Sequence, residues 1–344
     1  MTEQTATLRR TLSGAALPIT LLAMVAATLF AMNAGRYGID PVTVIKVILS
    51  RFIDLTPDWN ARVETVIYGV RLPRIGVALL VGACLACSGV TFQGVFRNPL
   101  VSPFLLGVSA GAGFGAALAI LQGGGNLTIQ IYAFAFGGLA VIIAVLLARL
   151  YKNSNTLVLI LSGTITGSVF TALLGLLKYT ADTENKLPVI EYWLLGSLSA
   201  AGNDALINLS VVSIPVMILV YLLRWRLNLL ASGDEQAQLL GVNVRRERVL
   251  HITLGTLLCA AAVSTCGIVG WVGLVAPHLA RMIVGPDHVK LVPMSLALGA
   301  TFLLVVDTLA RTLVQAEIPL GIVTALVGAP FFAFLLARSG RGWS

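Results

Sequence analysis

The sequence predicts an all-α membrane protein with about ten transmembrane helices in a single domain that covers residues 1–344. The chain is 57% hydrophobic and 11% charged, with a mean hydropathy of +0.92, whereas about 25% of the residues in a soluble domain are charged. Apolar runs close to the roughly 20 residues needed to cross a bilayer recur along the whole chain. Only short polar segments separate these runs, so we expect no separate soluble domain.

The predicted spans follow one another in order, each bounded by charged, Gly or Pro residues. The sixth is either one broken span or two, at 189–200 with 206–223, and a short extra helix is expected near Trp193. The other nine windows are 15–33, 72–94, 103–121, 128–149, 156–177, 249–269, 271–285, 291–309 and 319–337.

Lys and Arg in short loops set the orientation, because they are retained on the cytoplasmic side. Placing Arg9 and Arg10 inside and threading ten spans puts most of the 23 basic residues inside and both termini in the cytoplasm. The net charge of +8 is therefore a topology signal, and we expect contact with membrane lipid and not with nucleic acid. A cleaved signal peptide is the alternative for the first run. We favour an uncleaved span, because no small-x-small site precedes a soluble domain.

Two longer polar segments interrupt the spans. The external loop, 34–70, contains an amphipathic stretch from Pro41 to Phe52. The cytoplasmic loop, 224–248, is predicted to contain a short helix. We expect Ser232 and Glu235 to form a capping box at its start and Gly241 to supply a left-handed stop. A capped polar helix suits a protein partner better than a small ligand.

Small residues recur within the spans, as in Gly107-x3-Gly111-x3-Gly115 and Gly163-x3-Gly167. Such spacings let helix backbones approach closely, and we interpret them as packing within one subunit. The sequence Cys84-x-x-Cys87 has redox or metal spacing, but it lies among small residues, so packing is again the favoured interpretation.

Signatures of catalysis are missing from the sequence, which predicts no catalytic or metal site and no cofactor on this chain. No P-loop is present, because none of the five lysines follows a glycine. The three histidines stand at span ends, where helix-end hydrogen bonds are expected in place of metal ligation. An ion-driven transporter would need carboxylates deep in a span. Nearly every charge lies at a predicted span end, with Asp307 as the innermost candidate, so an ion-driven transporter is disfavoured. An intramembrane enzyme is also disfavoured, because the sequence shows no buried catalytic dyad or ligand cluster.

Three arginines, Arg71, Arg74 and Arg311, are predicted on the outer side against the positive-inside bias. One interpretation is a local structural role, such as a pair between Asp307 and Arg311 at i,i+4. The other is docking of a soluble partner's carboxylates, for which the guanidinium group is suited by bidentate pairing. Residue chemistry alone leaves both open.

Five segments in matching order resemble the permease subunit of ABC importers for iron–siderophores, haem and cobalamin, and the similarity spans roughly residues 17–338. The segments are RLPR at 71–74, SGVTFQGVFRNPLVSPFLLGVSAGAG at 88–113, SGDEQAQLLGV at 232–242, GWVGLVAPHLARMIVGPDH at 270–288 and EIPLGIVTALVGAPFF at 317–332.

The resemblance implies a type II importer permease fold in the inner membrane, with the fifth and tenth spans lining the path of two permease subunits. A homodimer is the favoured arrangement. It implies two cytoplasmic ATP-binding subunits, which hold ATP and Mg²⁺, and an external substrate-binding protein. Iron–siderophore is the leading substrate, ahead of haem, cobalamin and oxyanions such as molybdate. The implied sites are binding-protein docking at Arg71, Arg74 and Arg311, ATPase coupling at Asp234, Glu235, Ala237, Leu240 and Gly241, and an inner gate at Asn155 and Thr156.

Overall fold

The computed structural model describes residues 3–35, 37–150 and 156–339, and within them the secondary structure is entirely helical. The α-helices are α1 (Glu3–Asn33), α2 (Pro41–Leu49), α3 (Ala61–Glu64), α4 (Leu72–Phe96), α5 (Val108–Leu121), α6 (Asn126–Arg149), α7 (Thr156–Thr180), α8 (Lys186–Leu195), α9 (Asn203–Ala231), α10 (Asp234–Leu239), α11 (Val244–Cys266), α12 (Val272–Val284), α13 (His288–Thr312) and α14 (Leu320–Ser339). A π-helical segment, η1 (Thr65–Arg71), joins α3 to α4, and a 3₁₀ turn, η2 (Pro103–Leu106), precedes α5.

The number of spans agrees with the sequence prediction. Among the described residues, seven helices are long and apolar enough to cross a membrane: α1, the continuous 61–96 segment, α6, α7, α9, α11 and α13. Three shorter apolar helices, α5, α12 and the Leu320–Phe334 part of α14, complete a set of ten. The ambiguous sixth region is one long span, α9, preceded by α8, which is the expected extra helix near Trp193.

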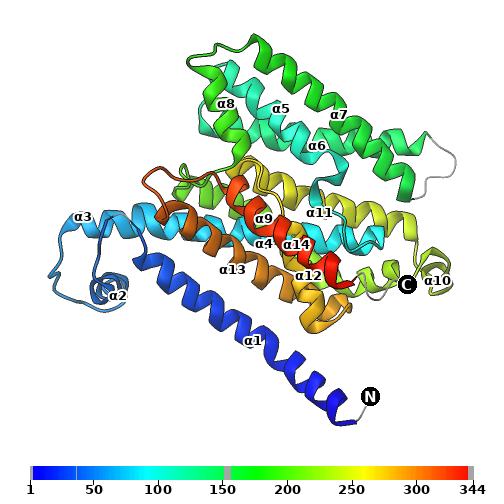
Figure 1. The fold of residues 1–344 in the computed structure, drawn as a ribbon, viewed down its shortest axis with the longest axis horizontal. Coiled ribbons are helices and arrows are strands. Elements are labelled where there is room, and N and C mark those ends of the chain that lie inside the picture. Colours follow the sequence, from blue (N-terminus) through cyan, green and yellow to red (C-terminus); the bar gives the residue numbers. More distant parts are fainter. Residues whose placement is uncertain (1–2, 36, 151–155, 340–344) are drawn as a thin grey trace.

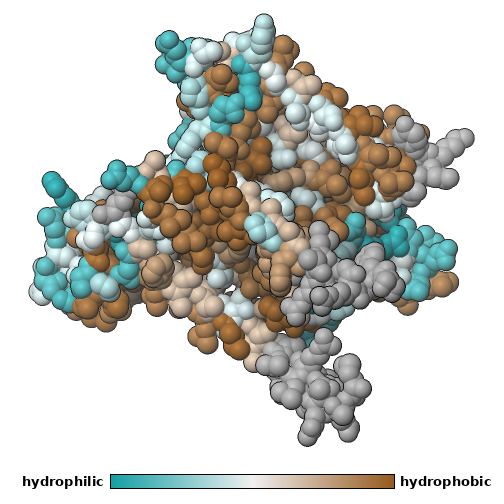
Figure 2. Space-filling view, in the orientation of Figure 1, coloured by the Kyte–Doolittle hydropathy of each residue, from teal (hydrophilic) through white to brown (hydrophobic). Residues whose placement is uncertain are grey.

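The polar surface gathers at opposite ends of the molecule. In Figure 1, α2 and α3 lie at one end of the long axis and α10 at the other, with the described ends of α1 and α14 on the α10 side. Figure 2 shows hydrophilic residues over both of these ends, and also at the top of the view, where Figure 1 places α8, with hydrophobic residues between them. This distribution is the one expected if the long axis runs across the bilayer, with the 34–70 and 224–248 segments on opposite faces.

Helix α4 forms the centre of the bundle, and most of its residues are buried. It packs against α9, α11, α12 and α13. Glycines let the backbone of α4 approach the backbones of α12 and α13 closely. A Cβ atom added to Gly89 would lie 1.8 Å from the carbonyl oxygen of Gly273, and one on Gly82 would lie 2.2 Å from that of Gly299. Side chains at these positions would push α12 and α13 away from α4.

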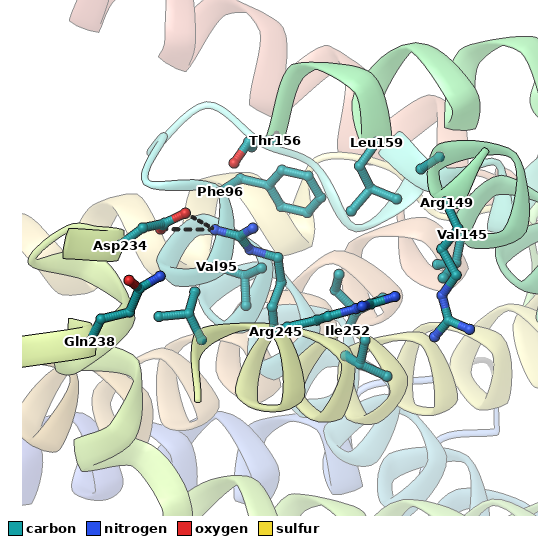
Figure 3. A pocket seen from close by; sticks show the side chains of 14 residues that line it. Val95, Phe96, Val145, Arg149, Thr156, Leu159, Asp234, Gln238, Arg245 and Ile252 are labelled. Carbon is teal, nitrogen blue, oxygen red and sulfur yellow. Dashed lines mark hydrogen bonds and ion pairs between the residues drawn. The ribbon is translucent and has the colours of Figure 1, made fainter. Parts of the chain in front are cut away.

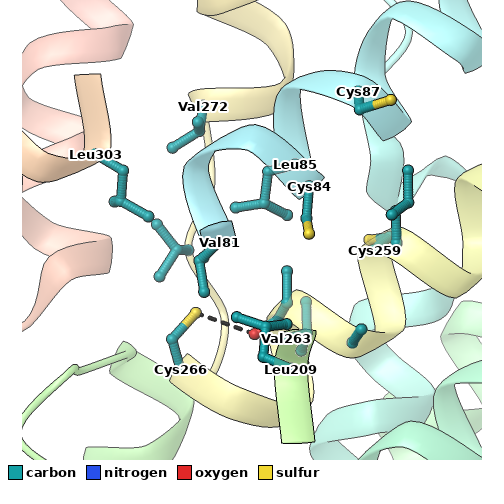
Figure 4. Packing of buried hydrophobic residues seen from close by; sticks show 14 of the residues in the cluster. Val81, Cys84, Leu85, Cys87, Leu209, Cys259, Val263, Cys266, Val272 and Leu303 are labelled. Carbon is teal, nitrogen blue, oxygen red and sulfur yellow. Dashed lines mark hydrogen bonds between the residues drawn. The ribbon is translucent and has the colours of Figure 1, made fainter. Parts of the chain in front are cut away.

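The small-residue runs pack helices of the same chain, as predicted. Cβ atoms on Gly111 and Gly115 would lie 2.4 Å from carbonyl oxygens of α6. Gly163 similarly faces the backbone of Leu105 and Leu106, beside α5. The four cysteines, which lie on α4 and α11, are buried free thiols among aliphatic side chains (Figure 4). They act as small packing residues of the core.

Candidate functional site

Helix α10 begins without the predicted side-chain cap. Its N-cap position is occupied by Gly233, at φ +114°, and no side chain caps its first amides. Ser232 instead ends α9, where its hydroxyl donates to the carbonyl of Leu229 at 2.8 Å. The expected Ser232–Glu235 capping box is therefore wrong, because the long preceding helix runs up to Ser232 and takes its hydroxyl.

The predicted stop at the other end of α10 is confirmed. Gly241 has φ +78°, its N–H donates to Gln238, and the N–H of Val242 donates to the carbonyl of Ala237 at 3.0 Å. This pair of bonds is a Schellman motif, which requires a left-handed residue that glycine adopts at little cost. The chain consequently turns sharply from α10 into α11.

An ion-pair network fixes α10 to the ends of two spans. Asp234 accepts two hydrogen bonds from Arg248 of α11, at 2.9 and 3.0 Å, and lies 3.4 Å from Arg97. Arg97 ends α4 in the left-handed conformation, at φ 53°. Ala237, on the inner face of α10, is fully buried. These contacts connect α10 to the end of α4 and to the start of α11. The role of Arg97 was not predicted, since no local pattern marks it as a partner of Asp234.

The outer face of α10 presents apolar side chains to solvent. Leu239 is 88% exposed and Leu240 is 65% exposed, and Glu235 is exposed beside them. Two adjacent leucines in a polar loop therefore expose apolar surface that nothing within the described residues covers. Of the predicted coupling residues, Glu235 and Leu240 lie on this surface, whereas Asp234, Ala237 and Gly241 hold the helix in place.

At the opposite end, the three predicted arginines converge. The Arg74 guanidinium bonds to Asp307, with Nη2 2.8 Å from Oδ1, and to Glu317, with Nη1 2.9 Å from Oε1. Arg71 donates to the carbonyls of Met32 and Tyr37. Glu317 was missed as a partner, although it stands in a segment that carries the family resemblance.

Arg311 completes this arginine cluster by donating to the carbonyls of Ala31 and Ala34, at 2.6 and 2.8 Å. The predicted local contact with Asp307 is present at 3.7 Å, but Arg74 is the closer partner of that carboxylate. Arg71 and Arg311 are only 4% and 9% exposed. The arginines therefore tie the end of α1 to the start of α4 and the end of α13.

A shallow groove of about 540 Å³ runs along α7, where η2 and the start of α5 meet it. Its lining includes Thr164, Ser168 and Thr171, whose hydroxyls each donate to a helix carbonyl four residues earlier. Because those protons are engaged, the hydroxyls face the groove as acceptors. No charged residue is among those that line it. The surface is therefore weakly polar and suited to loose contact.

The predicted inner gate is only partly described. Asn155 lies outside the described residues. Thr156 is the first residue of α7 and lines a cavity of about 220 Å³ beside α10, together with Asp234 and Gln238. Figure 3 shows this cavity between α10 and the neighbouring spans. Thr156, one of the two predicted gate residues, and α10 thus border the same space.

A multi-pass membrane protein with a docked helix at one polar end and an arginine cluster at the other has the layout of a transport permease. The chain belongs to the FecCD transport family, whose model matches residues 21–338. It is 41% identical to the molybdate import system permease MolB of Haemophilus influenzae, over 94% of this chain and 95% of that protein. It is 43% identical to a Helicobacter pylori protein assigned as an iron chelatin transport permease, over 80% and 83%.

The fold agrees with these relatives. A solved inward-facing conformation of an ABC transporter assigned to the metal-chelate type superposes with a TM-score of 0.84 at 39% identity, covering 94% of this chain and 98% of that one. Further relatives are hemin and cobalamin permeases. The predicted family and fold class are confirmed, and the relatives do not share one substrate.

Proposed function

We propose that this chain is the membrane subunit of an ATP-driven importer that passes an iron–siderophore complex into the cytoplasm. Two copies form the path, two ATP-binding subunits engage α10 from the cytoplasm, and a binding protein delivers substrate outside. The observation that carries this proposal is the exposed leucine face of α10 on a helix anchored to α4 and α11. Family membership adds that relatives are permease subunits of import systems.

Energy in this proposal comes from the partner subunits. An ion-driven transporter needs a membrane carboxylate that is free to bind and release its ion. Asp307, the innermost acid expected from the sequence, is instead held by Arg74 and has a fully buried side chain. Closure of the ATP-binding subunits would move α10, and the Asp234 contacts with Arg97 and Arg248 would carry that motion into the bundle.

The groove along α7 supports a shielded chelate as substrate. In this proposal α7 and α14 face the path, and the groove offers hydroxyl acceptors and small apolar groups in place of cations. A metal wrapped in organic ligands needs no strong counter-charge there. A second candidate, an oxyanion such as molybdate, is favoured by the near full-length similarity to the Haemophilus influenzae protein. Among the described residues of the groove, Ser109 is the one hydroxyl with no hydrogen bond of its own, so an oxyanion would find one donor there and would have to draw its other donors from elsewhere.

Docking of the binding protein is proposed at Arg71, Arg74 and Arg311. Arg71 donates to backbone carbonyls, and Arg311 donates to carbonyls while it lies 3.7 Å from Asp307, so acidic side chains of a partner would offer both guanidinium groups stronger, charge-assisted bonds. Charge reversal at Arg71 and Arg74 should weaken docking in nanodiscs and reduce its salt dependence. Reversal at the exposed Lys46 is the matched control. Unchanged docking by the Arg71 and Arg74 variants would refute this site.

The decisive test of function is transport in proteoliposomes. Purified permease, its ATP-binding subunits and its binding protein are supplied with ⁵⁵Fe-siderophore or with ⁹⁹Mo-molybdate. We expect concentrative iron uptake only when all components and ATP are present. Molybdate uptake alone would transfer the assignment to the second candidate. Concentrative uptake by the permease without nucleotide would overturn an ATP-driven mechanism.

A further inference from the structure

Three hollows meet on one side of the α10 end of the molecule. The 220 Å³ cavity beside α10 adjoins a 680 Å³ hollow at the start of α11 and a 210 Å³ hollow between α6 and α11. Arg149 and Val249 line all three. The hollows are therefore neighbours, and together we call them the α6–α11 groove, which extends from the polar surface to the space between two spans.

The polar mouth of the α6–α11 groove carries uncompensated positive charge. Arg149, Arg245 and Arg246 line it and are exposed, and none has a side-chain partner among the described residues. Nearby acids are already engaged, Asp234 by Arg248 and Glu247 by Arg226 at 2.5 Å. Figure 3 shows Arg149 and Arg245 directed to the same opening. An anion at the mouth would meet three guanidinium groups.

The inner part of the groove is apolar. Between α6 and α11 the lining consists of aliphatic side chains with one hydroxyl, that of Thr253, and one charged residue, Arg149, which it shares with the mouth. That hydroxyl donates to the carbonyl of Val249 at 2.8 Å, so it demands no partner from a ligand. The aliphatic residues are Val141, Ile142, Val145, Leu146, Val249 and Ile252. This part suits a hydrocarbon chain.

We propose that the α6–α11 groove binds an anionic phospholipid, with the phosphate on Arg149, Arg245 and Arg246 and an acyl chain between the two spans. Basic pockets between helices on the cytoplasmic side are a recognised setting for such headgroups. A soluble phosphate would leave the apolar part empty, and a zwitterionic lipid would bring a cation to the arginines. Both are poorer fits than an anionic lipid.

The bound lipid would also border α10. Asp234 and Gln238 of α10 line the cavity that opens from the groove. A headgroup there would bring negative charge near the Asp234 ion pairs with Arg97 and Arg248 and would fill space behind α10. The proposal therefore includes an effect of anionic lipid on how α10 is held, whatever substrate the permease carries.

The test is native mass spectrometry of the purified full chain, titrated with phosphatidylglycerol, phosphatidylcholine or soluble glycerol 3-phosphate. We expect retention of phosphatidylglycerol alone. Replacement of two arginines, Arg149→Gln with Arg245→Gln, should weaken its binding tenfold or more, since each basic residue contributes about 1 kcal/mol. The matched control is Lys290→Gln, which removes an exposed cation of the same polar end and should change nothing.

A second variant tests the apolar part without altering charge. Val145→Trp would fill the groove, because Val145 lines both the α10 cavity and the inner hollow. We expect it to lose phosphatidylglycerol while keeping the wild-type melting temperature. Equal retention of both lipids, binding of glycerol phosphate alone, or unchanged binding in either variant would refute the proposal. The assay uses no substrate or ATP, so its outcome is independent of the proposed function.

Discussion

Arg74, in the cluster with Arg71 and Arg311, allows a test of how much the buried ion pairs stabilise the fold. Its guanidinium bridges Asp307, whose side chain is fully buried, and Glu317, whose side chain is 27% exposed. Replacing Arg74 with Gln leaves the Asp307 carboxylate with Arg311 at 3.7 Å as its remaining cation. Removing one partner of a buried pair costs about 3–5 kcal/mol, because the other charge stays buried.

The reciprocal change should cost less. In Asp307→Asn, Arg74 keeps Glu317 at 2.9 and 3.0 Å and the new amide oxygen still accepts a hydrogen bond. We expect a loss of about 1–2 kcal/mol, the value of one weakened charged hydrogen bond. The double variant leaves no fully buried carboxylate without Arg74, because residue 307 is then an amide and Glu317 is 27% exposed. It should therefore be more stable than Arg74→Gln alone, with a coupling energy of about 2 kcal/mol.

Equilibrium unfolding in mixed detergent micelles, followed by circular dichroism, measures these free energies. The control is Lys46→Gln, which breaks the exposed Lys46–Asp58 pair and should change stability by less than about 0.5 kcal/mol. Additive losses in the double variant, or equal losses in the two single variants, would contradict the asymmetry of burial from which the prediction is derived.

Two further predictions concern α10 and the central helix α4. Replacing Leu239 and Leu240 with Ser should weaken binding of the ATP-binding subunits at least tenfold in a pull-down titration, with an unchanged melting temperature; a stable variant that binds normally would show that this face is not the contact. Gly89→Ala should destabilise the protein by about 3 kcal/mol or more, because its Cβ meets the Gly273 carbonyl, whereas Gly175→Ala on open α7 should be neutral. Similar melting temperatures for the two alanine variants would argue against the close α4–α12 contact.

Local pattern carried much of the prediction. Span positions depend on apolar length, so they can be predicted without tertiary contacts. Orientation is predicted from loop charge alone and stays a prediction. The stop at Gly241 was predicted for the same reason, since a left-handed residue after a short helix is a local requirement. The resemblance also predicted the family, and the comparison with known proteins confirms that family.

The remaining features depend on which helix ends the fold brings together. Arg74 meets Asp307 and Glu317, which are 233 and 243 residues away along the chain, so no spacing rule could have placed them. Ser232 failed as a cap because α9 extends far enough to use its hydroxyl. The α6–α11 groove likewise exists only because separate spans pack side by side. Local periodicity and charge thus determined the spans and the helix stop, whereas long-range packing alone decided the ion pairs and the groove.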